Sequence, residues 1–166
     1  MPCPLGGVGR DMHLRGAEAQ ALLDEKLTRV LVDESGWETI HWHPGQGTLW
    51  LLTYPQSEMH GGGPPDLREV SPEAVFQAGS QSVQWQCADL DALVSYLIDS
   101  WCERRATQPL GRVLSSWPHN GLTDGYAELR DALANARALR EPAITEVDGE
   151  LLGLALNAID RRLHSR

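Results

Sequence analysis

The sequence predicts an α+β fold: a small antiparallel sheet of three to four strands with flanking helices, followed by a C-terminal helical bundle. In the first half, short apolar or alternating runs are separated by Gly- and Pro-rich turns, a pattern typical of β-strands. From residue 89 onward, apolar residues recur at spacings of three and four, as in amphipathic helices. We therefore divide the chain into a mixed region, 1–79, and a mainly helical region, 80–166. Because regions this small bury little surface alone, we expect them to share one core.

The mixed region begins with residues 1–15, which show little pattern and are expected to be loosely held. Turn residues at Gly36 and at Pro44–Gly47 then separate periodic segments, and the second turn predicts a β-hairpin. Ser71 precedes Pro72 and Glu73, which is the pattern of a helix start. The predicted elements are a helix over 17–32, strands over 37–43, 49–54 and 67–70, a helix over 71–78 and a strand over 83–87.

The helical region is predicted to hold three or four helices. Thr123 is predicted to cap one of them, and Thr145 with Asp148 resembles a capping box at the start of the last. Cys102 falls within an apolar stripe and is predicted to be a small core residue. The expected helical segments are 89–102, 110–117, 123–139 and 145–163.

Charge narrows the classes of partner. The 166-residue chain has a net charge of −9, from 23 Asp and Glu against 14 Lys and Arg. An acidic protein repels nucleic-acid phosphates, so a broad nucleic-acid surface is not expected. A basic protein partner would be attracted, although the same charge also serves solubility alone. Residues 1–79 hold 11 acidic and 5 basic residues, which makes this region the better candidate for a basic partner.

Cysteine usage and hydropathy predict a cytoplasmic protein. The three cysteines, Cys3, Cys87 and Cys102, are odd in number and form no CxxC pair, as expected in a reducing compartment. No apolar run approaches the ~20 residues of a membrane helix, and the N-terminus lacks a signal-peptide pattern. Because no such run is present, we expect no membrane partner. The glycines at 6, 7 and 9 are not followed by the Lys-Ser/Thr of a phosphate loop, and we expect no cofactor.

Two catalytic patterns are incomplete. The run His60-Gly61-Gly62-Gly63 matches the oxyanion loop of some esterases, but the chain contains no GxSxG nucleophile motif. Ser57, His60 and Asp66 are the residue types of a catalytic triad, yet they lie in one loop where nothing in the sequence holds them in catalytic geometry. We therefore expect a protein that is not an enzyme.

A histidine pair leaves a metal-dependent alternative open. His41 and His43 lie on one face of a predicted strand, and Glu58 and His60 lie in the loop after its partner strand. Four such groups, if they converge, could hold zinc. A small metal-dependent enzyme using these four residues is thus the alternative function. The other interpretation is a half-exposed strand face beside a loop that polar side chains hold in place.

Tryptophans and acidic residues surround the predicted hairpin. Trp37, Trp42 and Trp50 on adjacent strands are predicted to be core residues rather than binding anchors. Asp33 and Glu34, with Glu38 nearby, are typical of a solvated turn and are also a candidate contact for a basic partner.

The segment from Asp33 to Glu73 carries a more specific signal. It contains Ser35-Gly36-Trp37-Glu38, Trp50, the unbroken run TYPQSEMHGGGPP from Thr53 to Pro65, Leu67, and Ser71-Pro72-Glu73. On these residues, the region of about 17–78 resembles the immunity protein 27 family of bacterial polymorphic-toxin systems. The resemblance implies a cytoplasmic, non-enzymatic, toxin-neutralising protein of mixed α/β build.

For such a protein we expect tight association with a cognate toxin domain, with a basic nuclease as one candidate. A non-catalytic scaffold or regulator is a further alternative. The motif loop, defined as Tyr54, Pro55, Gln56, Ser57, Gly61, Gly62 and Gly63, is either a pre-shaped contact surface or a structural link, and the residues leave both open. The predicted partner-binding residues are Asp33, Glu34, Glu38, Glu58, His60 and Asp66.

The chain also departs from the family pattern. The hairpin turn reads His43-Pro44-Gly45-Gln46-Gly47 where the family usually has an acidic residue before the proline and an Asp-Gly-Arg turn. Leu51 stands at a usually acidic position, and the usual N-terminal strand is not evident. If those charged positions contact the toxin, the cognate toxin of this protein differs.

Overall fold

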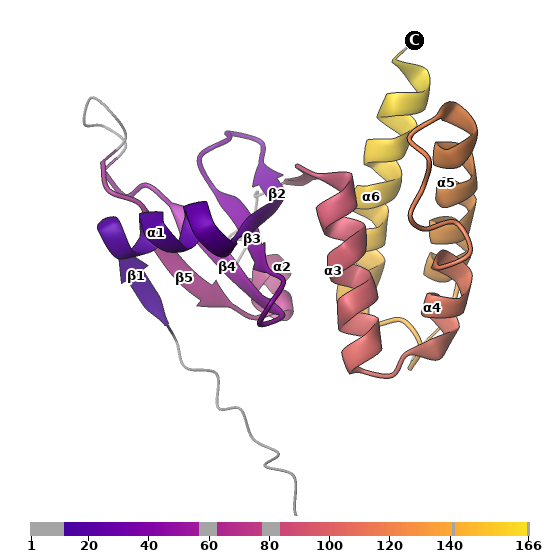
Figure 1. Ribbon diagram of the computed structural model, residues 1–166, viewed down its shortest axis with the longest axis horizontal. Helices are drawn as coiled ribbons and strands as arrows, with labels where there is room; N and C mark the ends of the chain where they lie inside the picture. The colour runs from indigo at the N-terminus through magenta and orange to yellow at the C-terminus, as the bar shows by residue number, and fades with distance from the viewer. Residues whose placement is uncertain (1–11, 57–62, 78–83, 141, 166) are drawn as a thin grey trace, which may run out of the picture.

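The computed structural model of the protein describes residues 12–56, 63–77, 84–140 and 142–165. Its strands form one antiparallel sheet in the order β1-β5-β4-β3-β2-β6 (Figure 1). The α+β class is confirmed, with six strands in the sheet instead of the three to four predicted. The strands are β1 (His13–Arg15), β2 (Thr28–Asp33), β3 (Thr39–His43), β4 (Thr48–Thr53), β5 (Asp66–Val70) and β6 (Trp85–Cys87).

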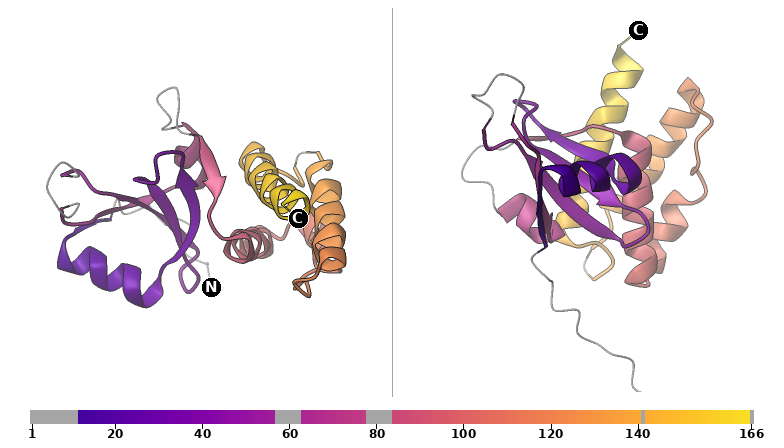
Figure 2. Two further views of the ribbon diagram at one scale, coloured as in Figure 1. Left: turned by 90° about the horizontal axis from the view of Figure 1, so that it is seen from above. Right: turned by 60° about the vertical axis from the view of Figure 1, so that its left-hand side comes forward.

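Helices cover both faces of the sheet. The mixed region contributes α1 (Ala17–Lys26) and α2 (Pro72–Gln77), and the rest of the chain contributes α3 (Leu90–Glu103), α4 (Thr107–Val113), α5 (Thr123–Arg137) and α6 (Glu146–His164). Figure 2 shows α1 on one face of the sheet, with the last four helices beyond the opposite face. None of the helices in the described ranges combines the length and apolar character that a bilayer crossing requires.

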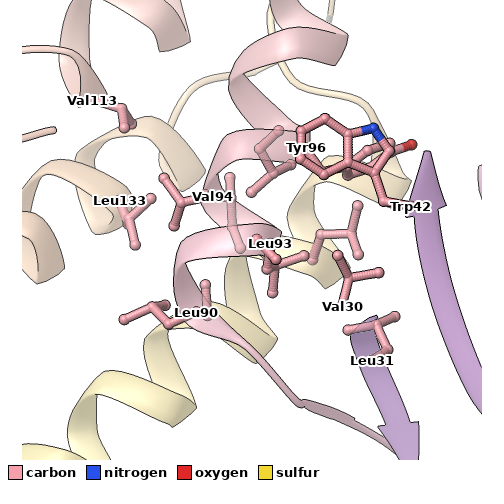
Figure 3. Packing of buried hydrophobic residues seen from close by; sticks show 14 of the residues in the cluster. Val30, Leu31, Trp42, Leu90, Leu93, Val94, Tyr96, Val113 and Leu133 are labelled. Atoms are coloured by element: carbon pink, nitrogen blue, oxygen red, sulfur yellow. The ribbon is translucent and has the colours of Figure 1, made fainter. Parts of the chain in front are cut away.

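The two faces bury different clusters. On the α1 face, Ala19 packs with Trp50, Leu52 and Leu67. On the other face, one cluster runs continuously from the sheet into the helices, and Figure 3 shows Val30, Leu31 and Trp42 beside residues of α3 such as Leu93 and Tyr96. The rings of Trp42 and Tyr96 meet edge to face, with centroids 6.1 Å apart. The boundary between regions 1–79 and 80–166 falls outside the described residues, so that division stays a prediction.

The predicted helix over 17–32 is wrong in its second half, because α1 ends at Lys26 and residues 28–33 form β2. The register of β2 against β3 shifts between Arg29 and Leu31, which is a bulge. Val30 and Leu31 are both buried in the same cluster as a result. A bulge breaks the alternation of a strand, so these adjacent apolar residues resemble a helical stripe in the sequence.

The N-terminal segment also differs from the prediction. Residues 13–15 form β1, which pairs with β5 through Leu14 and Leu67. A three-residue edge strand is too short for its pattern to be recognised. The rest of the predicted loose segment, residues 1–11, lies outside the described residues.

Several smaller predictions are settled as well. Ser71 accepts a hydrogen bond from the Ala74 N–H, which confirms its predicted place before α2. Thr145 and Asp148 form the predicted capping box. Cys102 is exposed and not a core residue. The predicted cap at Thr123 is wrong, because Thr123 is the first residue of α5 and the N-cap position before it is Leu122, whose side chain makes no capping hydrogen bond.

Candidate partner-binding surface

Two connections lie at the same end of the sheet. The β2–β3 connection, residues 33–38, is called the acidic turn below, and residues 54–65 connect β4 to β5. The pairings Val32–Thr39 and Thr53–Asp66 show that both connections lie at the same end of the antiparallel strands. Figure 1 shows the acidic turn and the described ends of the second connection, residues 54–56 and 63–65, on that side of the sheet. We call this side the loop end.

Asp33 organises the acidic turn. One of its carboxylate oxygens accepts a hydrogen bond from the Glu38 N–H at 2.9 Å, and the other accepts from the Ser35 N–H at 3.2 Å and from the Ser35 hydroxyl. The Ser35 hydroxyl oxygen accepts in turn from the Trp37 N–H at 3.2 Å. Gly36 has φ +79°, a conformation that L side chains rarely adopt, which explains the glycine at this position.

The same contacts keep the Asp33 carboxylate charged. Partial burial would raise the pKa of Asp33, but the hydrogen bonds from Ser35, Glu38 and Gly36 outweigh it and hold the pKa below its usual value. Asp33 is therefore ionised at neutral pH, and its charge is directed into the turn.

The turn presents a large apolar side chain to solvent. Trp37 is 53% exposed, so its predicted place in the core is wrong, whereas Trp42 and Trp50 are buried as predicted. Glu34 beside it is exposed, and Glu38 is half-buried. A tryptophan on a fixed backbone between carboxylates is the kind of residue that dominates the binding energy of protein interfaces.

Asp66 is part of the framework of the loop end. It is 6% exposed, and its two carboxylate oxygens lie 2.6 Å from His13 Nε2 and 2.8 Å from Arg15 Nε. Burial would raise the pKa of Asp66, but His13 and Arg15 together lower it. Asp66 thus fixes β1 to the start of β5, and its oxygens are occupied within the chain.

The motif loop is described only at its ends. Gly63 has φ +68°, and a Cβ atom there would lie 2.9 Å from the Gln56 Cβ, so the two ends of the loop are tightly packed. Arg15, Gln56 and Pro65 are among the residues that line a cavity of about 250 Å³ at its base. Ser57, Glu58, His60, Gly61 and Gly62 lie outside the described residues. The choice between a contact surface and a structural link therefore stays open.

The histidine pair lies on the same face of the sheet as Trp50, because His41 pairs with Trp50 and His43 with Thr48, and it does not lie at the loop end. His41 and His43 are 6% and 7% exposed, and His41 Nε2 lies 2.9 Å from the Thr39 hydroxyl. Burial, helped by Arg29, lowers the pKa of His41 to about 4, so its ring is neutral at pH 7. Within the described ranges, no third His, Cys, Asp or Glu joins them in a metal-binding group.

The sequence predicts Asp33, Glu34 and Glu38 as contacts for a partner, which stays a prediction, and it does not predict the exposed position of Trp37. The predicted strand over 37–43 includes Trp37, although β3 begins only at Thr39. Ser35 and Gly36 next to Trp37 are turn residues, and they were the available signal that Trp37 lies in a turn.

The part of the chain that forms the loop end matches a known protein family model. Residues 17–71 match the family model described as Immunity protein 27. This match runs from α1 to the residue before α2, it includes the acidic turn and both ends of the motif loop, and it confirms the predicted resemblance. Searches of curated proteins and of solved structures gave no match to the chain.

Proposed function

We propose, from the match of residues 17–71 to immunity protein 27, that this protein binds a cognate bacterial toxin domain and neutralises it by tight association. The acidic turn supplies the primary contact, and the toxin domain is basic, with a nuclease as the leading candidate. The protein acts in the cytoplasm without a cofactor and without chemistry of its own. Binding covers the active site of the toxin or a surface next to it.

The observation that carries this proposal is the exposed Trp37 on a turn that is already ordered. Ordering a flexible loop during binding costs free energy, and hydrogen bonds inside the turn remove most of that cost in advance. Trp37 loses a large apolar area from water when it enters a pocket on the partner. Glu34 and Glu38 stand on either side of Trp37 in sequence, so the partner surface needs basic groups around that pocket.

Charge supports the same partner. The net charge of −9 attracts a basic domain over several ångströms and accelerates its association. Among the described residues, neither Glu34 nor Glu38 takes part in an ion pair. Both carboxylates are therefore available to Lys or Arg of the toxin.

The other predicted contacts take different roles in the proposal. Glu58 and His60 remain proposed contacts because the described ends of the motif loop, Gln56 and Gly63, lie at the same end of the sheet as Trp37. Asp66 is proposed to act indirectly, since His13 and Arg15 already occupy its carboxylate. Its part is to keep the base of the motif loop in place.

The test is co-expression with the toxin domain encoded beside the gene, scored first by survival and then by co-purification. We expect rescue by the wild-type protein and loss of rescue with Trp37→Ala or with Glu34→Lys combined with Glu38→Lys. The control is Leu122→Ala, which removes an apolar side chain that is 61% exposed before α5. The proposal fails if the wild-type protein neither rescues nor co-purifies, or if Trp37→Ala binds as tightly as Leu122→Ala.

A further inference from the structure

The strand β6 forms one edge of the sheet, and its register defines which backbone groups face outward. Gln86 pairs with Val32 of β2, and the Ala88 N–H donates to the Val30 carbonyl at 3.0 Å. In an antiparallel ladder, alternate residues bond to the same neighbour, so Gln86 bonds to β2 while Trp85 and Cys87 direct their N–H and C=O groups away from it. Within the described part of the chain, no backbone group bonds to these outward groups.

A cleft runs beside this edge. It has a volume of about 450 Å³ and is lined by Trp85 and Cys87 on the strand side and by Leu154, Asn157 and Arg161 of α6 on the other. This volume falls within the usual range of ligand pockets, roughly 300–1,000 Å³. Two hydrogen bonds hold the lining of the cleft in position. The Trp85 indole N–H donates to the Val75 carbonyl, and Arg161 donates to the Gln86 side-chain oxygen at 3.2 Å.

The acidic turn borders the end of this edge. Asp33 pairs with Trp85, so the turn follows directly from the residue that opposes the start of β6. Inside the cleft, the charge of Asp160 is compensated by Arg130. Glu34, by contrast, makes no ion pair with any described residue. The lining also includes Arg161, which makes no ion pair with any described residue. An occupant that carries no positive charge inside the cleft and is basic at the end near the turn therefore matches the charges.

We propose that an extended segment of the toxin adds to the sheet at the edge of β6, as a further strand lying in the cleft between β6 and α6. Its backbone pairs with the outward groups of Trp85 and Cys87. One of its side chains enters the cleft toward Leu154, and a Lys or Arg at its end meets Glu34. An unpaired edge strand is a template for such pairing. This inference rests on the proposed function, and it makes the C-terminal helices part of the binding surface.

The first test is hydrogen exchange of the full-length protein, alone and with the toxin domain encoded beside the gene. We expect the amides of Trp85 and Cys87 to exchange more slowly in the complex, because the added strand accepts their hydrogen bonds. The second test fills the cleft with Asn157→Trp, at an exposed position of α6. This variant should weaken toxin binding by about tenfold or more. Ala127→Trp, at an exposed position of α5, is the matched control and should bind normally.

The outcomes separate the two proposals. If a complex forms and depends on Trp37, but the Trp85 and Cys87 amides stay unprotected and Asn157→Trp binds normally, the edge proposal is overturned and the immunity function stands. If no complex forms, both are overturned. If the isolated protein forms a dimer that Asn157→Trp abolishes, the edge belongs to a second copy of the chain and the toxin proposal for this edge is wrong.

Discussion

Asp33 and Glu38 are hydrogen-bonded to each other twice, once between their main chains and once from the Glu38 N–H to the Asp33 carboxylate, each at 2.9 Å. The two bonds close a turn that carries Trp37 and Glu34 between them. The Asp33 carboxylate therefore orders the backbone of the turn, whereas the neighbouring Glu34 is exposed to solvent. This difference between two adjacent acidic residues can be measured.

Asp33→Ala is expected to weaken toxin binding by about tenfold, because the turn loses the carboxylate that orders it and must be ordered on binding. Glu34→Ala removes the same charge but leaves the turn intact. Calorimetry at two salt concentrations separates the two effects. The loss from Glu34→Ala should shrink at high salt, and most of the loss from Asp33→Ala should persist. Equal salt dependence in both variants would show that Asp33 acts only through its charge.

Acid should destabilise the protein through His41. The unfolded chain binds a proton there near pH 6.5, whereas the folded chain resists protonation until its pKa of about 4. The free energy of unfolding should therefore fall as the pH drops from about 6.5 to about 4, by up to about 3 kcal/mol. Urea unfolding of the wild-type protein and of His41→Gln across this range provides the measurement. The variant should lose this part of the pH dependence, and parallel curves would contradict the assignment.

Two ion pairs of the helical region should differ in their effect on stability. Arg104 Nη2 lies 2.8 Å from each carboxylate oxygen of Asp148, whose side chain is 5% exposed and also caps α6. Asp148→Ala leaves the Arg104 guanidinium without its ion-pair partner and the Thr145 N–H without its acceptor, so it should cost about 3 kcal/mol. Asp160→Ala breaks the more exposed pair with Arg130 and should lower the urea midpoint far less, because water screens this pair. Similar shifts in urea midpoint for the two variants would rule out this ranking.

Two helical glycines should respond in opposite directions to alanine. A Cβ at Gly125 would lie 2.1 Å from the Asn120 side-chain oxygen, which accepts a hydrogen bond from the Leu122 N–H. Gly125→Ala must displace Asn120 and should destabilise the protein by about 1–2 kcal/mol despite the higher helix propensity of alanine. At Gly149 no atom lies within 4 Å, so Gly149→Ala should stabilise α6 by about 0.5–1 kcal/mol. Thermal unfolding of the two variants, side by side, distinguishes the signs.

Local sequence signals predicted those parts of the fold that local interactions determine. The capping box of Thr145 and Asp148 and the strand around Trp50 could be predicted because each depends on residues close together in the chain. The strand β2 could not, since its bulge exists only against β3, and β1 requires β5 as a partner. The same limit applies to the proposed binding surface. The acidic residues could be read from the sequence, whereas the cleft beside β6 exists only when α6 packs next to it.

The hydrogen bonds of the acidic turn divide its positions into two kinds. Asp33 and Ser35 contribute side-chain atoms to the network, and Gly36 contributes its unusual backbone conformation. Trp37 and Glu38 take part through their main chains alone, which every residue except proline can supply. Natural selection can therefore replace the side chains at 37 and 38, and at 34, while the scaffold stays the same. If this turn contacts the toxin as proposed, its contact residues can change through single substitutions, with little loss of folding stability at each step.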